Sequence, residues 1–168
     1  SIRRNPFMLR NRSVPDIQLK RKNWEQRILE NDAKHLVFLD ESGINTDMTR
    51  RYARAKKNQR AVDSTPLNTP ATTTVLSSIR LDGSCIYTTY QGGTTAERFE
   101  NYLKSYLLPA LGPDDIVVMD NMRSHHAKIV KNLLAEKHIQ YLYLPPYSPD
   151  YNPIENMWSK IKANMRKQ

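Results

Sequence analysis

Residues 144–161 limit what this chain can fold into more than any other segment, because they join a strand end to a helix start. Two successive prolines close the apolar run 139–144, since proline has no N–H to donate to a sheet. Asn152 followed by Pro153 then favours a helix start, with a capping residue before a proline at the first helical position. Two elements of defined geometry therefore place Glu155, the third residue of that helix.

Glu155 has two interpretations. In a capping box its carboxylate accepts a hydrogen bond from the backbone N–H of Asn152. At about 100° per residue, however, the helix carries an apolar stripe and a charged flank, formed by Ile154, Trp158, Ile161 and Met165 and by Glu155, Lys162 and Arg166. A carboxylate at the rim of a buried face, with cations along the same edge, suits a metal site that faces a polyanion.

The remaining pattern predicts an α/β domain with a mixed sheet. Apolar or β-rich runs predict five strands, at 36–39, 72–79, 85–90, 116–119 and 139–144. Asp82-Gly83 joins the second and third strands as a hairpin, whereas helical segments separate the later strands. We therefore expect three antiparallel strands followed by strands linked through helical crossovers.

Helix signals lie between these strands. Thr94 and Glu97 form a capping box for a helix that ends at Pro109, with core-facing Phe99, Tyr102, Leu103, Tyr106 and Leu107. Ser124 is a candidate cap for a second helix, whose inner face would include His126, Ile129, Val130 and Leu133. Residues 16–31 can form a further helix after Pro15.

Asp40 and Asp120 each follow a short apolar run that predicts a buried strand. If those strands are neighbours, the two carboxylates lie side by side at the carboxyl edge of the sheet and repel each other unless a cation separates them. The alternative is that each aspartate only ends a strand or caps a turn. Glu41 should point to the opposite side of its strand, and Asp114, Asp115 and Asp150 read as turn residues. With Glu155, the two aspartates form an oxygen-ligand set for Mg²⁺ or Mn²⁺.

The charge balance supports a polyanionic partner. The formal net charge is +9, and residues 1–27 hold eight basic residues against two acidic ones. A second basic stretch, at 47–60, predicts a solvated hairpin or loop beside the sheet. Cys85 is the one cysteine, which excludes an intrachain disulfide and fits a reducing compartment, and no run is long enough to cross a membrane.

Three segments, 39–43 (Leu-Asp-Glu-Ser-Gly), 120–125 (Asp-Asn-Met-Arg-Ser-His) and 144–160, resemble the DDE transposases of the mariner-like superfamily, most closely their bacterial insertion-sequence branch. The 34 residues between Asp120 and Glu155 also match that family's spacing. The resemblance covers about residues 36–166, and it implies an RNase H-like fold in which a mixed five-stranded sheet is flanked by helices.

The resemblance also implies the chemistry. Asp40, Asp120 and Glu155 would be the catalytic triad that binds two Mg²⁺ (or Mn²⁺) ions, with Asn121 and His125 in supporting roles. The reaction would be cleavage of double-stranded DNA at transposon ends, followed by strand transfer into target DNA, typically at a TA dinucleotide. Basic residues would contact the DNA, namely Arg50, Arg51, Lys56, Lys57, Lys162 and Arg166. We expect a homodimer on DNA and a cytoplasmic, nucleoid-associated location in a bacterium.

Two departures and two alternatives accompany this interpretation. Relatives often carry a Trp and a Gly in the basic stretch where this chain has residues 52–60, and residues 1–35 leave room only for a basic linker or the remnant of an upstream DNA-binding module. Residues 36–168 would then form the catalytic domain. A metal-dependent nuclease or resolvase without strand transfer, and a domesticated DNA-binding protein, remain alternatives.

Overall fold

The computed structural model describes residues 15–45 and 72–165 of this chain. Its strands are β1 (Leu36–Asn45), β2 (Thr72–Ile79), β3 (Cys85–Gln91), β4 (Ile116–Met119) and β5 (Gln140–Tyr143). Its α-helices are α2 (Pro15–Leu29), α3 (Ala96–Tyr102), α4 (Lys128–Glu136) and α5 (Ile154–Met165). Short turns complete it, namely η1 (Ala33–His35), a π-helical turn η2 (Leu103–Leu107), η3 (Leu108–Ala110) and η4 (Pro149–Tyr151).

The strands form one mixed sheet in the order β3-β2-β1-β4-β5. β1 pairs antiparallel with β2 and β2 with β3, whereas β4 lies parallel to both β1 and β5. The β2–β3 hairpin turns at Asp82-Gly83, where Gly83 adopts a φ of 83° that favours glycine. The predicted five-stranded sheet, with its antiparallel start and its crossover connections, is confirmed.

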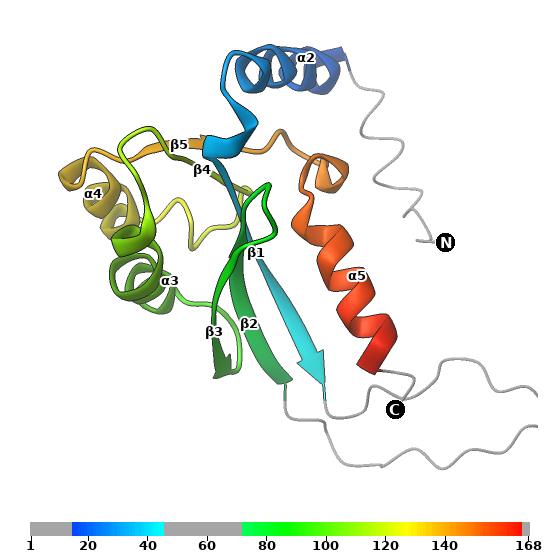
Figure 1. Cartoon of the computed structure of the whole chain (residues 1–168), viewed down its shortest axis with the longest axis vertical. Coiled ribbons are helices and arrows are strands. Elements are labelled where there is room, and N and C mark those ends of the chain that lie inside the picture. Colours follow the sequence, from blue (N-terminus) through cyan, green and yellow to red (C-terminus); the bar gives the residue numbers. More distant parts are fainter. Residues whose placement is uncertain (1–14, 46–71, 166–168) are drawn as a thin grey trace, which may run out of the picture.

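Helices cover both faces of this sheet (Figure 1). On one face, Val37 and Leu39 of β1 pack with α3, η2 and α4 in the larger core. On the other face, Leu36 of β1 belongs to a smaller core, against which Phe38 and two residues of α2, Trp24 and Ile28, pack. Side chains alternate along a strand, so even-numbered residues of β1 point toward the face covered by α2 and α5.

The helix starts differ from the prediction. α3 is capped by Thr95, whose hydroxyl accepts from the Arg98 N–H at 3.3 Å, while the hydroxyl of Thr94 donates to Glu41. α4 begins at Lys128 and not after Ser124, so the predicted cap is wrong. Hydrogen-bonded turns after Asp120 occupy the intervening residues and delay the helix.

Some of the residues predicted to face the core are exposed. The predicted core residues Phe99, Tyr102, Leu103 and Leu107 are buried, but Tyr106 is 45% exposed because η2 is a π-helical turn with a longer period than an α-helix. On α4, Val130 and Leu133 are buried as predicted, whereas Ile129 is 37% exposed.

The predicted N-terminal helix is confirmed as α2, which has no buried residue. It contacts the sheet through Trp24 and Ile28. Within the described ranges, no helix combines the length and the apolar character needed to cross a bilayer.

Candidate active site

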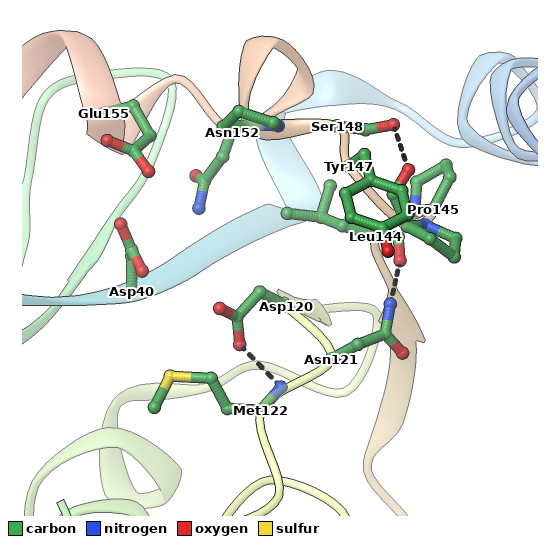
Figure 2. A pocket seen from close by; sticks show the side chains of 12 residues that line it. Asp40, Asp120, Asn121, Met122, Leu144, Pro145, Tyr147, Ser148, Asn152 and Glu155 are labelled. Atoms are coloured by element: carbon green, nitrogen blue, oxygen red, sulfur yellow. Dashed lines mark hydrogen bonds between the residues drawn. The ribbon is translucent and has the colours of Figure 1, made fainter. Parts of the chain in front are cut away.

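A cavity of about 350 Å³ lies where β1, the end of β4 and the start of α5 meet. Asp40, Asp120 and Glu155 all line it, together with residues 144–149. Figure 2 shows Asp40 and Glu155 pointing toward one another across the cavity, with Asp120 on the adjoining wall. The three predicted carboxylates, from three separate segments, are therefore brought together.

The register of β1 and β4 explains why the two aspartates meet. Phe38 is paired with Val118 in the parallel ladder, and both lie on the α5 side of the sheet. Two residues further along, Asp40 within β1 and Asp120 directly after β4 continue on that same side. Their predicted adjacency is confirmed by this pairing.

The prediction that Asp40 follows its strand is wrong. β1 continues for five residues beyond Asp40, because its antiparallel pairing with β2 extends to Asn45, and Asp40 itself is opposite Ser77. The sequence after Asp40 is mostly polar and therefore did not predict this extension, which depends on pairing with β2 and not on local apolar residues. Glu41 points to the other face, as predicted, and accepts from Thr94.

The start of α5 does not use Glu155 as a cap. The Asn152 N–H donates to the carbonyl of Pro149 at 3.1 Å, so the donor of a capping box is already satisfied. Asn152 caps the helix itself, since its Oδ1 accepts from the Ile154 N–H at 3.3 Å. The Glu155 carboxylate is free to face the cavity.

Charge repulsion is built into this cavity. Asp40 is only 7% exposed, and burial, followed by the negative charges of Glu155 and Asp120, raises its pKa to about 7. Loss of solvent and the charge of Asp120 also raise the pKa of Glu155, while the Lys162 ammonium acts in the opposite direction. A cation in the cavity would relieve this repulsion.

The donor set fits a hard divalent cation. Carboxylate oxygens are the ligands that Mg²⁺ and Mn²⁺ prefer, and three such groups line this one cavity. As they stand, no three histidine, cysteine or acidic side chains within the described residues are gathered closely enough to hold one ion. The carboxylates would have to turn inward around a bound cation.

Asp120 is oriented by two donors. Its Oδ1 accepts from the Met122 N–H at 3.1 Å. The Nδ1 of His125 lies 3.2 Å from the backbone carbonyl of Asp120 and 2.8 Å from its Oδ1. Figure 2 shows the other carboxylate oxygen turned toward the Asp40 side of the cavity. His125 is completely buried and packs on Phe99 at 4.1 Å between ring centroids. Its ring is therefore a rigid support behind Asp120.

His126 was predicted to face the core, and that prediction is wrong. It is half-buried, stacks on Tyr143 at 4.0 Å, and places its Nε2 3.1 Å from the Oδ1 of Asn121. The Asn121 Nδ2 donates to the carbonyl of Leu144. Because α4 starts late, helical spacing does not govern this segment, and the adjacent His125 enters the core instead.

The predicted DNA contacts are only partly described. Lys162 lies on α5, half-buried, on the same flank as Glu155. Arg50, Arg51, Lys56, Lys57 and Arg166 lie outside the described residues, as does the basic stretch 47–60.

Several residues that line the cavity were not among the predicted site residues, including Met122, Tyr147 and Asn152. Asn152 was treated only as a cap, yet Figure 2 shows its amide directed into the cavity. Tyr147 has a φ of 56°, uncommon for a bulky residue, and the prolines on its N-terminal side were the available signal of an unusual turn.

Comparisons with known proteins place this chain in a family. The family model for the DDE superfamily endonuclease matches residues 35–168. The Tcb2 transposase of Caenorhabditis briggsae is 30% identical over 67 residues, and the Tc1 transposase of Caenorhabditis elegans is 28% identical over 67 residues. Each match covers 40% of this chain but only 24% of the curated relative.

Solved structures show the same fold. The Mos1 transposase paired-end complex with left transposon end has a TM-score of 0.71 at 21% identity, covering 96% of this chain and 50% of that chain. The catalytic domain of Mos1 mariner transposase has a TM-score of 0.63 at 20% identity, covering 98% of this chain and 74% of that one. The fold is therefore RNase H-like, and the chain belongs to the DDE endonuclease superfamily.

Proposed function

We propose that this chain is the catalytic domain of a DNA transposase, which cuts double-stranded DNA at transposon ends and transfers the freed strand into target DNA. The observation that carries the proposal is the meeting of Asp40, Asp120 and Glu155 at one cavity, on a chain of the DDE superfamily. Residues 36–168 constitute the catalytic domain in this proposal, and residues 1–35 a basic linker or the remnant of an upstream module.

Asp40, Asp120 and Glu155 would hold two Mg²⁺ or Mn²⁺ ions. Bound there, the ions would activate the attacking oxygen and stabilise the leaving oxygen of the phosphodiester. Solved Mos1 complexes with Mg or Mn support a divalent requirement. His125 keeps Asp120 oriented, because its buried ring cannot turn away, and Asn121 ties the segment after β4 to residue Leu144.

The proposed DNA contacts are Arg50, Arg51, Lys56, Lys57, Lys162 and Arg166. The net charge of +9 supports attraction to the phosphate backbone. Mos1 has been solved as a paired-end complex, which supports a homodimer assembled on DNA here too. The target would be a TA dinucleotide, and the source a bacterial insertion sequence with the protein in the cytoplasm at the nucleoid, as the motif resemblance suggests.

The test compares the native chain with Glu155→Gln on labelled duplex DNA in Mg²⁺ or Mn²⁺. The substitution preserves shape but removes the ligand charge, so we expect cleavage and joining to fall by about 100-fold or more, at least the upper end of the range for residues that only orient a metal ligand. A pre-cut end with a free 3′-hydroxyl reports joining separately. Glu136→Gln is the matched control, because Glu136 is exposed at the end of α4 and does not line the cavity.

The outcomes separate the candidate functions. Joining by the native chain identifies a transposase, whereas cutting without joining of the pre-cut end identifies a nuclease. Equal activity of Glu155→Gln and native protein would exclude Glu155 as a metal ligand.

A further inference from the structure

Helix α2 has no buried residue, yet its side chains contact one wall of the cavity. The wall is the segment 148–152, which leads into α5 and includes η4. Figure 1 shows α2 lying beyond the loop that enters α5. Three side chains of α2, Arg21, Trp24 and Glu25, make the contacts.

Arg21 contacts three residues of that segment. Its Nη2 donates to Asp150 at 2.9 Å, and its Nη1 donates to the hydroxyl of Ser148. Its guanidinium carbon lies 4.1 Å from the ring centroid of Tyr151. Ser148 is 4% exposed and itself lines the cavity, so Arg21 is one contact away from the site.

Tyr151 is held between two further residues of α2. Its ring stacks on Trp24 at 5.0 Å and only 8° from parallel, and its hydroxyl donates to Glu25. Trp24 in turn packs against the smaller core, of which Leu144, a residue that lines the cavity, is a member. Charge, stacking and hydrogen bonding therefore act on the same short turn.

Backbone hydrogen bonds connect this turn to Glu155. The carbonyl of Ser148 accepts from the Tyr151 N–H at 3.1 Å, and the carbonyl of Pro149 accepts from the Asn152 N–H at 3.1 Å. The carbonyl of Asn152 then accepts from the Glu155 N–H at 3.2 Å. Backbone hydrogen bonds thus link the residues that α2 contacts to the residue that faces Asp40.

We propose that α2 is a positioning element of the active site, in which Arg21 and the Trp24–Tyr151 stack hold segment 148–152 and so set the position of Glu155. The proposal rests on the proposed function for its consequence, since a displaced Glu155 matters through metal binding. Its mechanical part, the immobilisation of the first turn of α5, is independent of the chemistry.

The first experiment measures amide hydrogen exchange of the metal-free chain over residues 151–158. Arg21→Ala removes the side-chain hydrogen bonds to Ser148 and Asp150, so we expect exchange at the Asn152 and Glu155 amides to become several-fold faster. Arg21→Lys, which keeps the charge, should restore part of the protection. Lys22→Ala is the matched control, because it removes the same charge from an exposed neighbour and should leave exchange unchanged.

The second experiment measures Mn²⁺ affinity by calorimetry on the same variants. We expect Arg21→Ala to bind Mn²⁺ about tenfold more weakly, in the range seen for residues that orient metal ligands. Removal of the positive charge of Arg21 would by itself strengthen Mn²⁺ binding, because it lowers the repulsion of the cation. A loss of Mn²⁺ affinity would therefore result from altered ligand geometry. In the Glu155→Gln background, Arg21→Ala should cause no further loss.

The outcomes keep the two proposals apart. Unchanged exchange in Arg21→Ala overturns the role of α2, as does an equal additional loss of Mn²⁺ affinity in the Glu155→Gln background. If the native chain binds no Mn²⁺, the proposed metal site fails, while the exchange data still decide the role of α2. Should Arg21→Ala not fold, Tyr151→Phe, which keeps the stack and removes only the hydroxyl bond to Glu25, must show faster exchange than Lys22→Ala or the proposal falls.

Discussion

At the scale of single residues, the orientation of the Asp120 carboxylate depends on its contact with the buried imidazole of His125. The buried Nε2 of His125 has no hydrogen-bond partner within the described residues, whereas Nδ1 lies 2.8 Å from Asp120. The proton of a neutral ring is therefore best placed on Nδ1, where both the backbone carbonyl of Asp120, at 3.2 Å, and its Oδ1 are near, and the second carboxylate oxygen remains available.

His125→Phe tests this orienting role. Phenylalanine retains the aromatic packing on Phe99 and removes the buried unpaired nitrogen, so we expect the melting temperature to be retained. Without the donor to Asp120, Mn²⁺ affinity and strand cleavage should each fall about 10–100-fold. If melting temperature and Mn²⁺ affinity fell together, His125 would contribute to core packing and not to the orientation of Asp120.

Asp40→Asn tests the charge repulsion in the cavity. Asp40 has a pKa raised to about 7, so the native state gains stability from the protonated carboxyl below the unfolded value and loses it as pH rises toward 7. Asparagine cannot ionise, and we expect it to stabilise the metal-free protein at pH 8 by roughly 2–4 kcal/mol. Denaturant unfolding in EDTA should show this difference shrinking toward pH 4, together with abolished cleavage at pH 8.

At the scale of elements, one ion pair joins the end of β2 to the start of β4. Arg80 donates to both oxygens of Asp115, at 3.0 and 2.6 Å, and the His35 Nδ1 lies 3.4 Å away. Asp115 was predicted as a turn residue, and it does accept from the Gly112 N–H at 2.7 Å. It is also buried, with the Arg80 guanidinium lowering its pKa to about 2.

Asp115→Asn should lower the free energy of unfolding by roughly 2 kcal/mol at pH 7. A depressed carboxyl pKa contributes stability that is present above the unfolded value and lost as pH falls through the folded one. The difference should therefore disappear as pH is lowered from about 4 to about 2. Asp114→Asn, at the exposed adjacent position, is the control in urea unfolding and should differ little from the native chain.

At the scale of the whole molecule, the two faces of the sheet are not equivalent. Helix α5 covers one face, and α3 and α4 cover the other (Figure 1). Asp40 points to the α5 side, and α5 itself carries Glu155 and Lys162, whereas Lys104 is exposed on η2, which packs on the opposite face. If DNA approaches the cavity, lysines on the two faces should contribute differently to binding, although each carries the same charge.

Lys162→Ala should weaken binding to duplex DNA of any sequence and reduce the slope of log affinity against log salt by about 1. Lys104→Ala should leave that slope unchanged, because it lies away from the cavity. Fluorescence anisotropy between low and moderate salt measures both. Equal slopes for the two variants would indicate that DNA does not follow the α5 face.

The sequence by itself determined the strand and helix inventory, the mixed sheet and the three acidic candidates, because apolar periodicity, prolines and turn residues act locally. It could not determine that β1 runs on past Asp40, that His125 and not His126 enters the core, or that α4 starts at Lys128. The first two outcomes depend on partners distant in the chain, namely β2 and Phe99, whereas the late start of α4 follows from hydrogen-bonded turns between Met122 and Ala127. The contact of α2 with the turn before Glu155 is of the same kind, since Arg21 and Asp150 are 129 residues apart and only the tertiary structure brings them together.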